Sequence, residues 1–331
     1  MKINDHLYVV GGGDYGYNLS NRLDANVYVI DTGDELWMID AGFDGGERVL
    51  QNIRTDGLDL SRITKLFVTH YHADHAGALA FMRESLDDHL EICISERAAP
   101  AVRVADEDII GLRWAKSFNF YPSDFTWEPC DIDVELTHNH ATTSNDFQLT
   151  AIETNGHCNG HMNFLVTGGE RSYLFSGDHV FWGGKIILQN VADSSVQDYA
   201  KSMNLLLEYD FQALMPGHLN FSLENGRRHV QSAADLDPAC RDAPRPGRAH
   251  ARLVELQAGA GQARLGDVPA GLGVDHVHLG HRLALEQAGG ALVLELRLAE
   301  PGLGLGDLLR VGALVDGSEH AAGFACGAGR R

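Results

Sequence analysis

Short runs of β-branched and aromatic residues recur along the first two thirds of the chain, and these runs predict strands. Between them, apolar residues at helical spacing predict helices; Val49, Leu50 and Ile53, for example, share one face. The predicted strands are residues 7–10, 26–30, 35–39, 65–69, 147–153, 162–167, 172–175 and 212–215. The predicted helices are residues 45–56, 75–86 and 195–209. Because the early strands are linked as hairpins and the later ones alternate with helices, we expect an α/β (α+β) fold with two packed sheets and outer helices.

Residues 97–130 do not follow this rhythm. They hold a dense set of aromatic side chains: Trp114, Phe118, Phe120, Tyr121, Phe125 and Trp127. A helical insert packed against the core accounts for them and is the favoured interpretation. The alternative is a lid whose aromatic rings line a pocket.

Composition changes near residue 238. Residues 1–238 carry 16 basic and 36 acidic side chains, whereas residues 239–331 carry 10 of each and all ten bases are Arg. We therefore expect a folded domain over residues 1–236 and a Gly/Ala/Arg-rich extension over residues 237–331. The extension is either genuine, as strand-like alternation at 283–285 and 292–298 suggests, or a GC-rich reading frame that was not selected to encode this fold.

The charge of −20 narrows the classes of partner. A nucleic-acid or anionic-membrane surface needs a basic face, so neither partner is expected. The first residues lack the basic and apolar regions of a secretory signal, and the five cysteines are scattered. These features predict a cytoplasmic protein that acts on a small molecule; a homodimer is left open.

The segment from Thr69 to Gly77 carries the most chemistry. His70, His72, Asp74 and His75 place four metal-capable side chains within six residues, after an apolar run and before a predicted helix. Several imidazoles and a carboxylate cannot be buried without partners, since each unpaired polar group costs about 1–3 kcal/mol. A bound cation satisfies them together, so this cluster predicts a metal site.

Further residues that can bind a metal follow the later predicted strands, and each lies beside a glycine that permits a tight turn. They are His157 in Gly156-His157, Asp178 in Gly177-Asp178 and His218 in Pro216-Gly217-His218. Together with Asp40 in Asp40-Ala41-Gly42, these motifs follow the order found in one family. The chain resembles the metallo-β-lactamase-fold hydrolase superfamily, in particular its glyoxalase II and lactonase branches, over roughly residues 5–236.

The resemblance implies a four-layer αββα sandwich with two metal ions at one edge of the sheets. His70, His72 and His157 would bind the first ion, and Asp74, His75 and His218 the second. Asp178 would bridge the two, and Asp40 would support the site without binding metal. The resemblance implies two Zn²⁺ ions per chain, which suit these ligands, while Fe and Mn stay open.

Two cations about 3.5–4 Å apart would lower the pKa of a shared water and stabilise a developing oxyanion. The resulting metal-bound hydroxide would attack an ester, thioester or lactone, with Asp74 or Asp178 as the catalytic groups that orient it and carry its proton. Cleavage of a β-lactam amide is an alternative. An iron-dependent persulfide dioxygenase, a nuclease and a non-catalytic binding module are the other readings of the same motifs.

Neighbouring polar residues have simpler interpretations. His161 is expected to be structural, His179 a pocket-wall residue and Cys158 a small packed residue. The histidines at 138 and 140 are expected in a solvated turn, and the glycine run at 11–13 in a hairpin turn, because no Gly-Lys-Ser/Thr follows it. His276, His278 and His281 lie in the extension and carry little weight.

Overall fold

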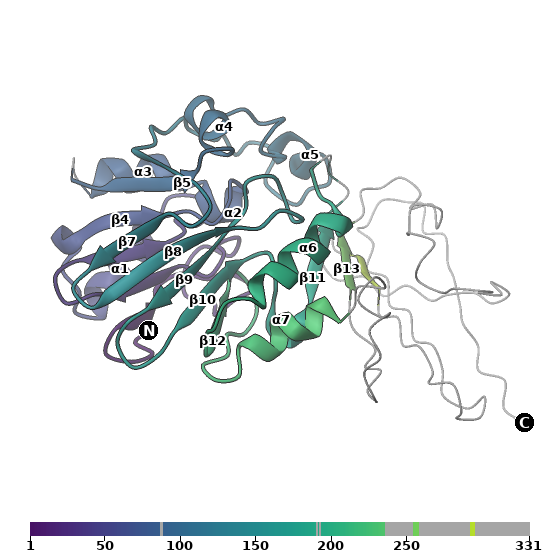
Figure 1. Cartoon of the computed structure of the whole chain (residues 1–331). Helices are drawn as coiled ribbons and strands as arrows, with labels where there is room; N and C mark the ends of the chain where they lie inside the picture. The colour runs from purple at the N-terminus through teal and green to yellow at the C-terminus, as the bar shows by residue number, and fades with distance from the viewer. Residues whose placement is uncertain (87–88, 190, 192, 236–253, 258–291, 295–331) are drawn as a thin grey trace, which may run out of the picture.

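The computed structural model describes residues 1–86, 89–189, 191, 193–235, 254–257 and 292–294. Two sheets stack face to face within this part, and helices cover their outer faces (Figure 1). The rest of the predicted extension, including residues 283–285 and its three histidines, lies outside the described residues. None of the described helices is long and apolar enough to cross a bilayer.

The first sheet has the strand order β1-β2-β3-β4-β5-β6. Its strands are β1 (Leu7–Val9), β2 (Tyr28–Asp31), β3 (Leu36–Ile39), β4 (Ile63–Phe67), β5 (Glu91–Ser95) and β6 (Val134–Leu136). The first three strands pair antiparallel, as the hairpin prediction required, and the pairs from β3 to β6 are parallel. The carboxyl ends of β3, β4 and β5 therefore meet at one edge of the sheet.

The second sheet has the order β12-β10-β9-β8-β7. Its strands are β7 (Ala141–Ser144), β8 (Phe147–Glu153), β9 (Met162–Thr167), β10 (Tyr173–Gly177) and β12 (Ala213–Pro216). Only the β10–β12 pair is parallel, so the carboxyl ends of these two neighbours lie side by side. A third, smaller sheet joins β11 (Ile186–Gln189) to β13 (Val254–Gln257) and β14 (Leu292–Leu294).

Strand alternation divides the apolar side chains between layers. In β3, Trp37 and Ile39 enter the core between the two sheets, whereas Leu36 and Met38 enter the core on the outer face. The same period of two places Phe164 of β9 between the sheets and Leu165 on the other side. Strands with two buried faces explain why these runs are almost continuously hydrophobic.

Helices close both outer faces. Those of the described part are α1 (Glu47–Thr55), α2 (Ala73–Ala76), α3 (Leu79–Ser85), α4 (Ala99–Val104), α5 (Leu112–Ser117), α6 (Val196–Leu206) and α7 (Arg227–Ala234), with short 3₁₀ helices η1 (Leu60–Arg62) and η2 (Trp182–Gly184). Val49, Leu50 and Ile53 of α1 pack on the first sheet, as their spacing predicted. Tyr199, Met203 and other residues of α6 pack with α7 on the second sheet. The predicted αββα sandwich is confirmed.

The predicted helix at 75–86 was wrong in its start and its continuity. The structure has α2 from Ala73 and then α3 from Leu79, because the peptide groups between them bond elsewhere. The Asp74 carbonyl accepts from the Ala25 N–H at 3.0 Å, and the Ala78 N–H donates to the Gly42 carbonyl at 3.1 Å. The break keeps the metal-capable segment tied to the first sheet.

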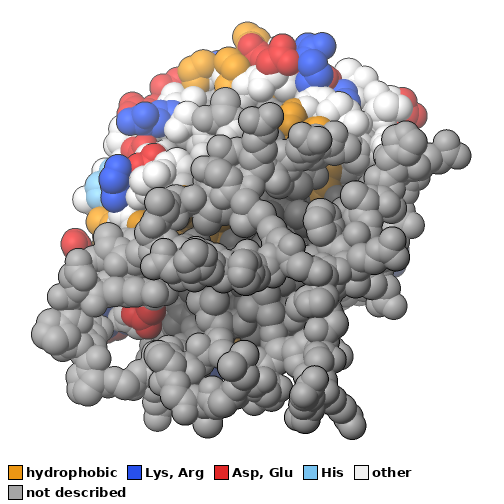
Figure 2. Space-filling view, turned by 90° about the vertical axis from the view of Figure 1, so that its right-hand side faces the viewer, with side chains coloured by type: hydrophobic (Ala, Val, Ile, Leu, Met, Phe, Trp, Pro, Cys, Tyr) orange, Lys and Arg blue, Asp and Glu red, His pale blue; other side chains and the backbone are white. Residues whose placement is uncertain are grey.

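The segment 97–130 contains α4 and α5 and packs on the first sheet. Tyr121 and Trp127 are buried in the same core cluster as α1, and Phe120 and Phe125 pack against it. Figure 2 shows acidic, basic and hydrophobic side chains mixed at the top of the molecule, the level of α4 and α5 in Figure 1. Segment 97–130 also carries exposed apolar residues, such as Val104, which is 67% exposed.

Truncation of Phe164 to Ala should test the inter-sheet core. The ring is fully buried and lies 5.6 Å from that of Phe67, so the cavity should lower the free energy of unfolding by about 3–5 kcal/mol. Urea denaturation measures it. The exposed control Val104→Ala should change it by less than about 0.5 kcal/mol; equal effects of the two variants would contradict this account of the core.

Candidate metal centre

Seven side chains from four separate segments meet at one edge of the two sheets. The segments follow β4, β8, β10 and β12 and include the start of α2. The structure places them in two groups, and within each group the ligand atoms lie within 4.8 Å of one another. The first group is His70, His72 and His157; the second is Asp74, His75, Asp178 and His218.

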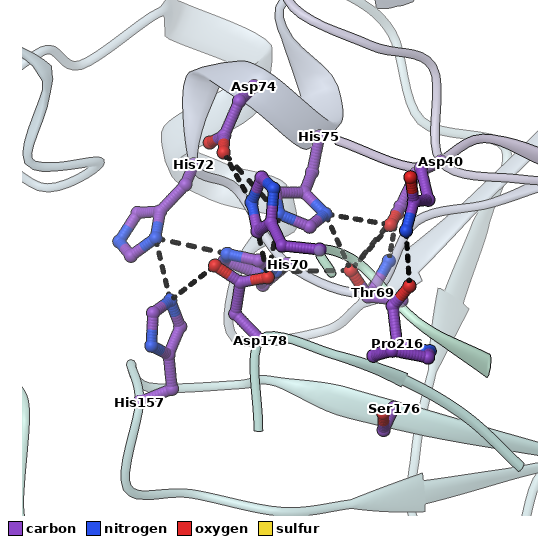
Figure 3. Close-up of polar contacts among 12 residues, drawn as sticks. Asp40, Thr69, His70, His72, Asp74, His75, His157, Ser176, Asp178 and Pro216 are labelled. Carbon is purple, nitrogen blue, oxygen red and sulfur yellow. Dashed lines mark hydrogen bonds and ion pairs between the residues drawn. The ribbon is translucent and has the colours of Figure 1, made fainter. Parts of the chain in front are cut away.

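In the first group, three imidazoles turn their ring nitrogens to a common point (Figure 3). His72 Nδ1 lies 3.0 Å from His70 Nε2 and 2.9 Å from His157 Nε2. Burial lowers the pKa of each of the three, so the neutral form that binds metals is favoured. Nitrogens that share one Zn²⁺ at 2.0–2.1 Å would be roughly 3.3 Å apart, close to the spacing seen.

The second group mixes carboxylates with imidazoles. Asp74 Oδ2 lies 2.9 Å from His218 Nε2 and 3.7 Å from His75 Nε2. Asp178 Oδ1 lies 3.2 Å from His75 Nε2 and 3.5 Å from His218 Nε2. Four nitrogen and oxygen atoms therefore surround one small volume.

Asp178 lies between the two groups (Figure 3). Its Oδ1 faces the second group, while its Oδ2 is 3.9 Å from His157 Nε2 in the first. The preceding Gly177 has a φ of 46°, and an added Cβ would meet His161 and Thr69 within 2.8 Å, so only glycine fits this turn. The turn directs the Asp178 carboxylate into the gap between the groups.

The pKa of His218 in the second group shifts in the opposite direction to the pKa values of the histidines in the first. Burial disfavours the charged form of His218, but Asp178 and Asp74 outweigh it and raise its pKa to about 9. Burial likewise opposes ionisation of Asp74, yet His75 and His218 lower its pKa to about 2. Without a metal, the carboxylates draw protons onto their histidine neighbours; a cation binding here would release them.

The donor set fits bound cations. Two buried atoms of the second group, His75 Nε2 and Asp178 Oδ1, lie 3.2 Å apart but make no well-formed hydrogen bond among the described residues. Natural cores rarely leave such atoms unpaired. A cation within the second group would satisfy these two atoms at once, and neutral imidazole with carboxylate is a donor set that divalent metals accept.

Asp40 holds the site from behind, as the resemblance implied. Its backbone φ is 62°. Its Oδ1 accepts the Thr69 N–H at 2.7 Å, and its Oδ2 pairs with His75 Nδ1 at 2.8 Å. The bond fixes the His75 ring so that Nε2 faces Asp178 and Asp74.

The His218 loop is anchored by a residue that the motif search did not find. Asn26 donates its side-chain amide to the carbonyls of Pro216 at 3.1 Å and Leu219 at 3.2 Å, and its N–H donates to Gly217. The glycine run 11–13 does not form the predicted hairpin turn: Gly11 and Gly13 bond to the carbonyls of Val27 and Asp24, and the turn follows at 14–17. An added Cβ at Gly12 would lie 2.7 Å from Asn26 Oδ1. Only the fold brings these residues together, so spacing could not reveal them.

Two further contacts were also missed. The hydroxyl of Tyr121 donates to Asp74 Oδ1 at 2.6 Å, and that of Tyr71 donates to Asp193. Asp193 also accepts the Asn159 N–H at 3.0 Å, which ties the loop before α6 to the His157 loop. The sequence pattern identifies Tyr121 only as one of several aromatic residues in segment 97–130.

The remaining candidates stay outside both groups. His161 follows a turn at 159–160, and its Nε2 accepts the Asp178 N–H at 3.3 Å, in agreement with a structural role. His179 is buried and stacks on Tyr199 at 5.0 Å. Burial raises the pKa of the Cys158 thiol well above its usual value, which opposes a role as nucleophile. His138 lies in an exposed turn, as expected.

Comparison with known proteins agrees with this geometry. The family model of the metallo-beta-lactamase superfamily matches residues 20–218, more than half of the chain. The chain belongs to the metallo-beta-lactamase superfamily. It is a hydrolase of this superfamily with a candidate divalent-metal site.

Similar proteins of the superfamily include a curated relative and solved structures. The chain is 27% identical over 162 residues to the probable metallo-hydrolase YqgX of Bacillus subtilis, covering 49% of this chain and 69% of that one. It matches the subclass B3 enzyme BJP-1 of Bradyrhizobium japonicum with a TM-score of 0.54 at 19% identity, over 71% and 89% of the two chains. It matches a metallo-beta-lactamase of Cronobacter sakazakii with a TM-score of 0.55 at 17% identity, over 73% of this chain and 97% of that one. These structures support the fold; the glyoxalase II or lactonase branch stays a prediction.

Asp24 should give the folded protein a pH dependence of its own. Burial raises its pKa to about 6, although the Phe43 N–H donates to it at 2.7 Å. Because the folded value exceeds the unfolded one, the native state binds more protons between pH 4 and 6. The protonated Asp24 carboxyl therefore contributes to stability below pH 4, and this contribution is lost as pH rises through 6. The loss lowers the free energy of unfolding by about 1–3 kcal/mol.

The variant Asp24→Asn cannot titrate, so its free energy of unfolding should not fall with pH for this reason. Relative to the variant, wild type should therefore lose about 1–3 kcal/mol of unfolding free energy between pH 4 and pH 7. Urea denaturation of metal-free protein measures it. The absolute stability of the variant is not the readout, since its amide would face the Asn21 N–H, which now donates to Asp24 at 3.0 Å. Parallel pH curves would refute the assignment; exposed Asp108→Asn is the matched control.

Proposed function

We propose that the protein is a dinuclear zinc hydrolase that cleaves an ester, thioester or lactone of a small molecule. The observation that carries the proposal is the position of Asp178, with one carboxylate oxygen toward each group of ligands. His70, His72 and His157 would hold one cation, and Asp74, His75 and His218 the other. When bound, such a pair supplies an activated water and polarises the substrate carbonyl.

The side chains of this site have separate tasks in the proposal. Asp178 orients the attacking water between the groups, and the Asp74 carboxylate accepts the proton that the water loses. Its Oδ1 accepts the Tyr121 hydroxyl and keeps a second lone pair for this proton, while Oδ2 faces His218 and His75 in the second group. His218 Nε2 lies 2.9 Å from Asp74 Oδ2, so these two atoms face the same volume as ligands of the second cation.

The surroundings of His218 support a small, partly apolar substrate. The ring of Tyr15 is 48% exposed and lies 6.5 Å from that of His218, and Phe181 lies 6.2 Å from it on another segment. The exposed Tyr15 ring offers contact area to an acyl group, whereas Phe181 is buried beside His218. The net charge of −20 disfavours polyanionic substrates.

A β-lactam amide is the second candidate, because the solved structures with this fold are named as metallo-β-lactamases. The same attack on an acyl carbon would open the ring, so both substrate classes belong in one assay. The name of the Bacillus subtilis relative supports hydrolysis without indicating a substrate.

The test is turnover of an ester, thioester, lactone and β-lactam panel by zinc-loaded and chelator-stripped protein. Zinc-loaded wild type should hydrolyse a substrate of the first three kinds, and stripping should abolish this. Asp178→Asn should lower kcat/KM more than about 100-fold, since loss of outer partners alone costs 10–100-fold. The exposed control Asp108→Asn should match wild type.

Three results would contradict the proposal. Iron content with oxygen consumption would favour the persulfide dioxygenase reading. Absence of turnover across the panel in metal-loaded protein would favour a binding module. Full activity of Asp178→Asn would remove the bridging role.

A further inference from the structure

Tyr121 reaches the candidate metal centre from the segment 97–130, far along the chain from every predicted ligand. Its side chain is 6% exposed, and its hydroxyl donates to Asp74 Oδ1 at 2.6 Å. That distance is typical of a hydrogen bond from a hydroxyl to an ionised carboxylate, which is about twice as strong as a neutral one. A phenol keeps its proton at neutral pH, so the donor is always available.

The two oxygens of Asp74 therefore have different partners. Oδ1 accepts from Tyr121, while Oδ2 lies 2.9 Å from His218 Nε2 and 3.7 Å from His75 Nε2. A carboxylate can bind a cation through one oxygen or both. With Oδ1 engaged by the phenol, the carboxylate is held in an orientation that presents Oδ2 to the second group.

The tyrosine ring itself is fixed by aromatic packing. It stacks on Phe43 at 5.0 Å with an angle of 15° between the rings, and Phe120 meets it edge-on at 4.9 Å. Phe125 packs on Phe43 as well, with 4.2 Å between the two ring centroids. Since Phe43 directly follows the Asp40-Ala41-Gly42 turn, the rings join segment 97–130 to the loop that supports His75.

We propose that Tyr121 is a positioning residue for the second cation site: its hydroxyl fixes Asp74 so that Oδ2 alone binds the ion. The inference rests on the proposed function for the existence of that ion. The aromatic residues of segment 97–130 thus have a specific task in addition to packing, which is to set the geometry of one ligand. A substrate-binding role does not fit, because the hydroxyl is buried and directed at Asp74.

The test is Tyr121→Phe, which removes one hydroxyl and keeps the stacked ring. Tyr173→Phe is the matched control, because that buried hydroxyl only accepts from the Asn4 amide at 2.7 Å. Chelator competition with Zn²⁺, and the absorption spectrum on Co²⁺ titration, report each site without any substrate. The affinity of the second site should fall about 10–100-fold in Tyr121→Phe, while the first site changes less than 2-fold and the control binds as wild type.

The melting temperature of the metal-free proteins separates positioning from folding. Tyr121→Phe should differ from the control by no more than a few degrees, and its second-site Co²⁺ bands should shift. Unchanged affinity and spectrum at the second site would overturn the inference, as would equal weakening of both sites. If wild type itself binds only one ion or none, the proposed function fails first, which is a distinct result.

Discussion

Burial of five imidazoles and two carboxylates at one sheet edge is the constraint on which the structure depends. Each such group costs free energy when it is unpaired, and three ring nitrogens that point at one another cannot satisfy themselves. Cations remove the conflict, because they bind the neutral imidazoles and share the charge of Asp74 and Asp178. Cation binding and the stability of this sheet edge are thus linked, because the buried polar groups are paired by metal ions rather than replaced by apolar side chains.

The fold supplies the precision that this solution requires. Alternation in β3 and β9 buries both faces of the sheets, so the strand ends that carry the ligands are rigid. Loops beyond those ends are held by specific polar bonds, such as Asp40 to His75 and Asn26 to the His218 loop. Rigid strands and bonded loops together keep the ligand atoms in place before any ion arrives.

The ligand residues could be predicted because they stand in short motifs whose order is shared by a family. The sandwich could be predicted because short runs of β-branched and aromatic residues separate clearly from stretches with helical spacing in residues 1–235. The break between α2 and α3 could not, since it depends on bonds from Ala25 and Gly42, far away in the chain. The contacts of Asn26 and Tyr121 were missed for the same reason. β5 lay in an apolar run too short to assign, and β7 is polar on its exposed side.

Anomalous diffraction from crystals of the zinc-loaded protein, recorded at the zinc edge, tests the central claim most directly. The account predicts two peaks about 3.5–4 Å apart. One should lie among His70, His72 and His157, and the other among Asp74, His75 and His218, with the Asp178 carboxylate between them. A single peak, or peaks away from these residues, would contradict it.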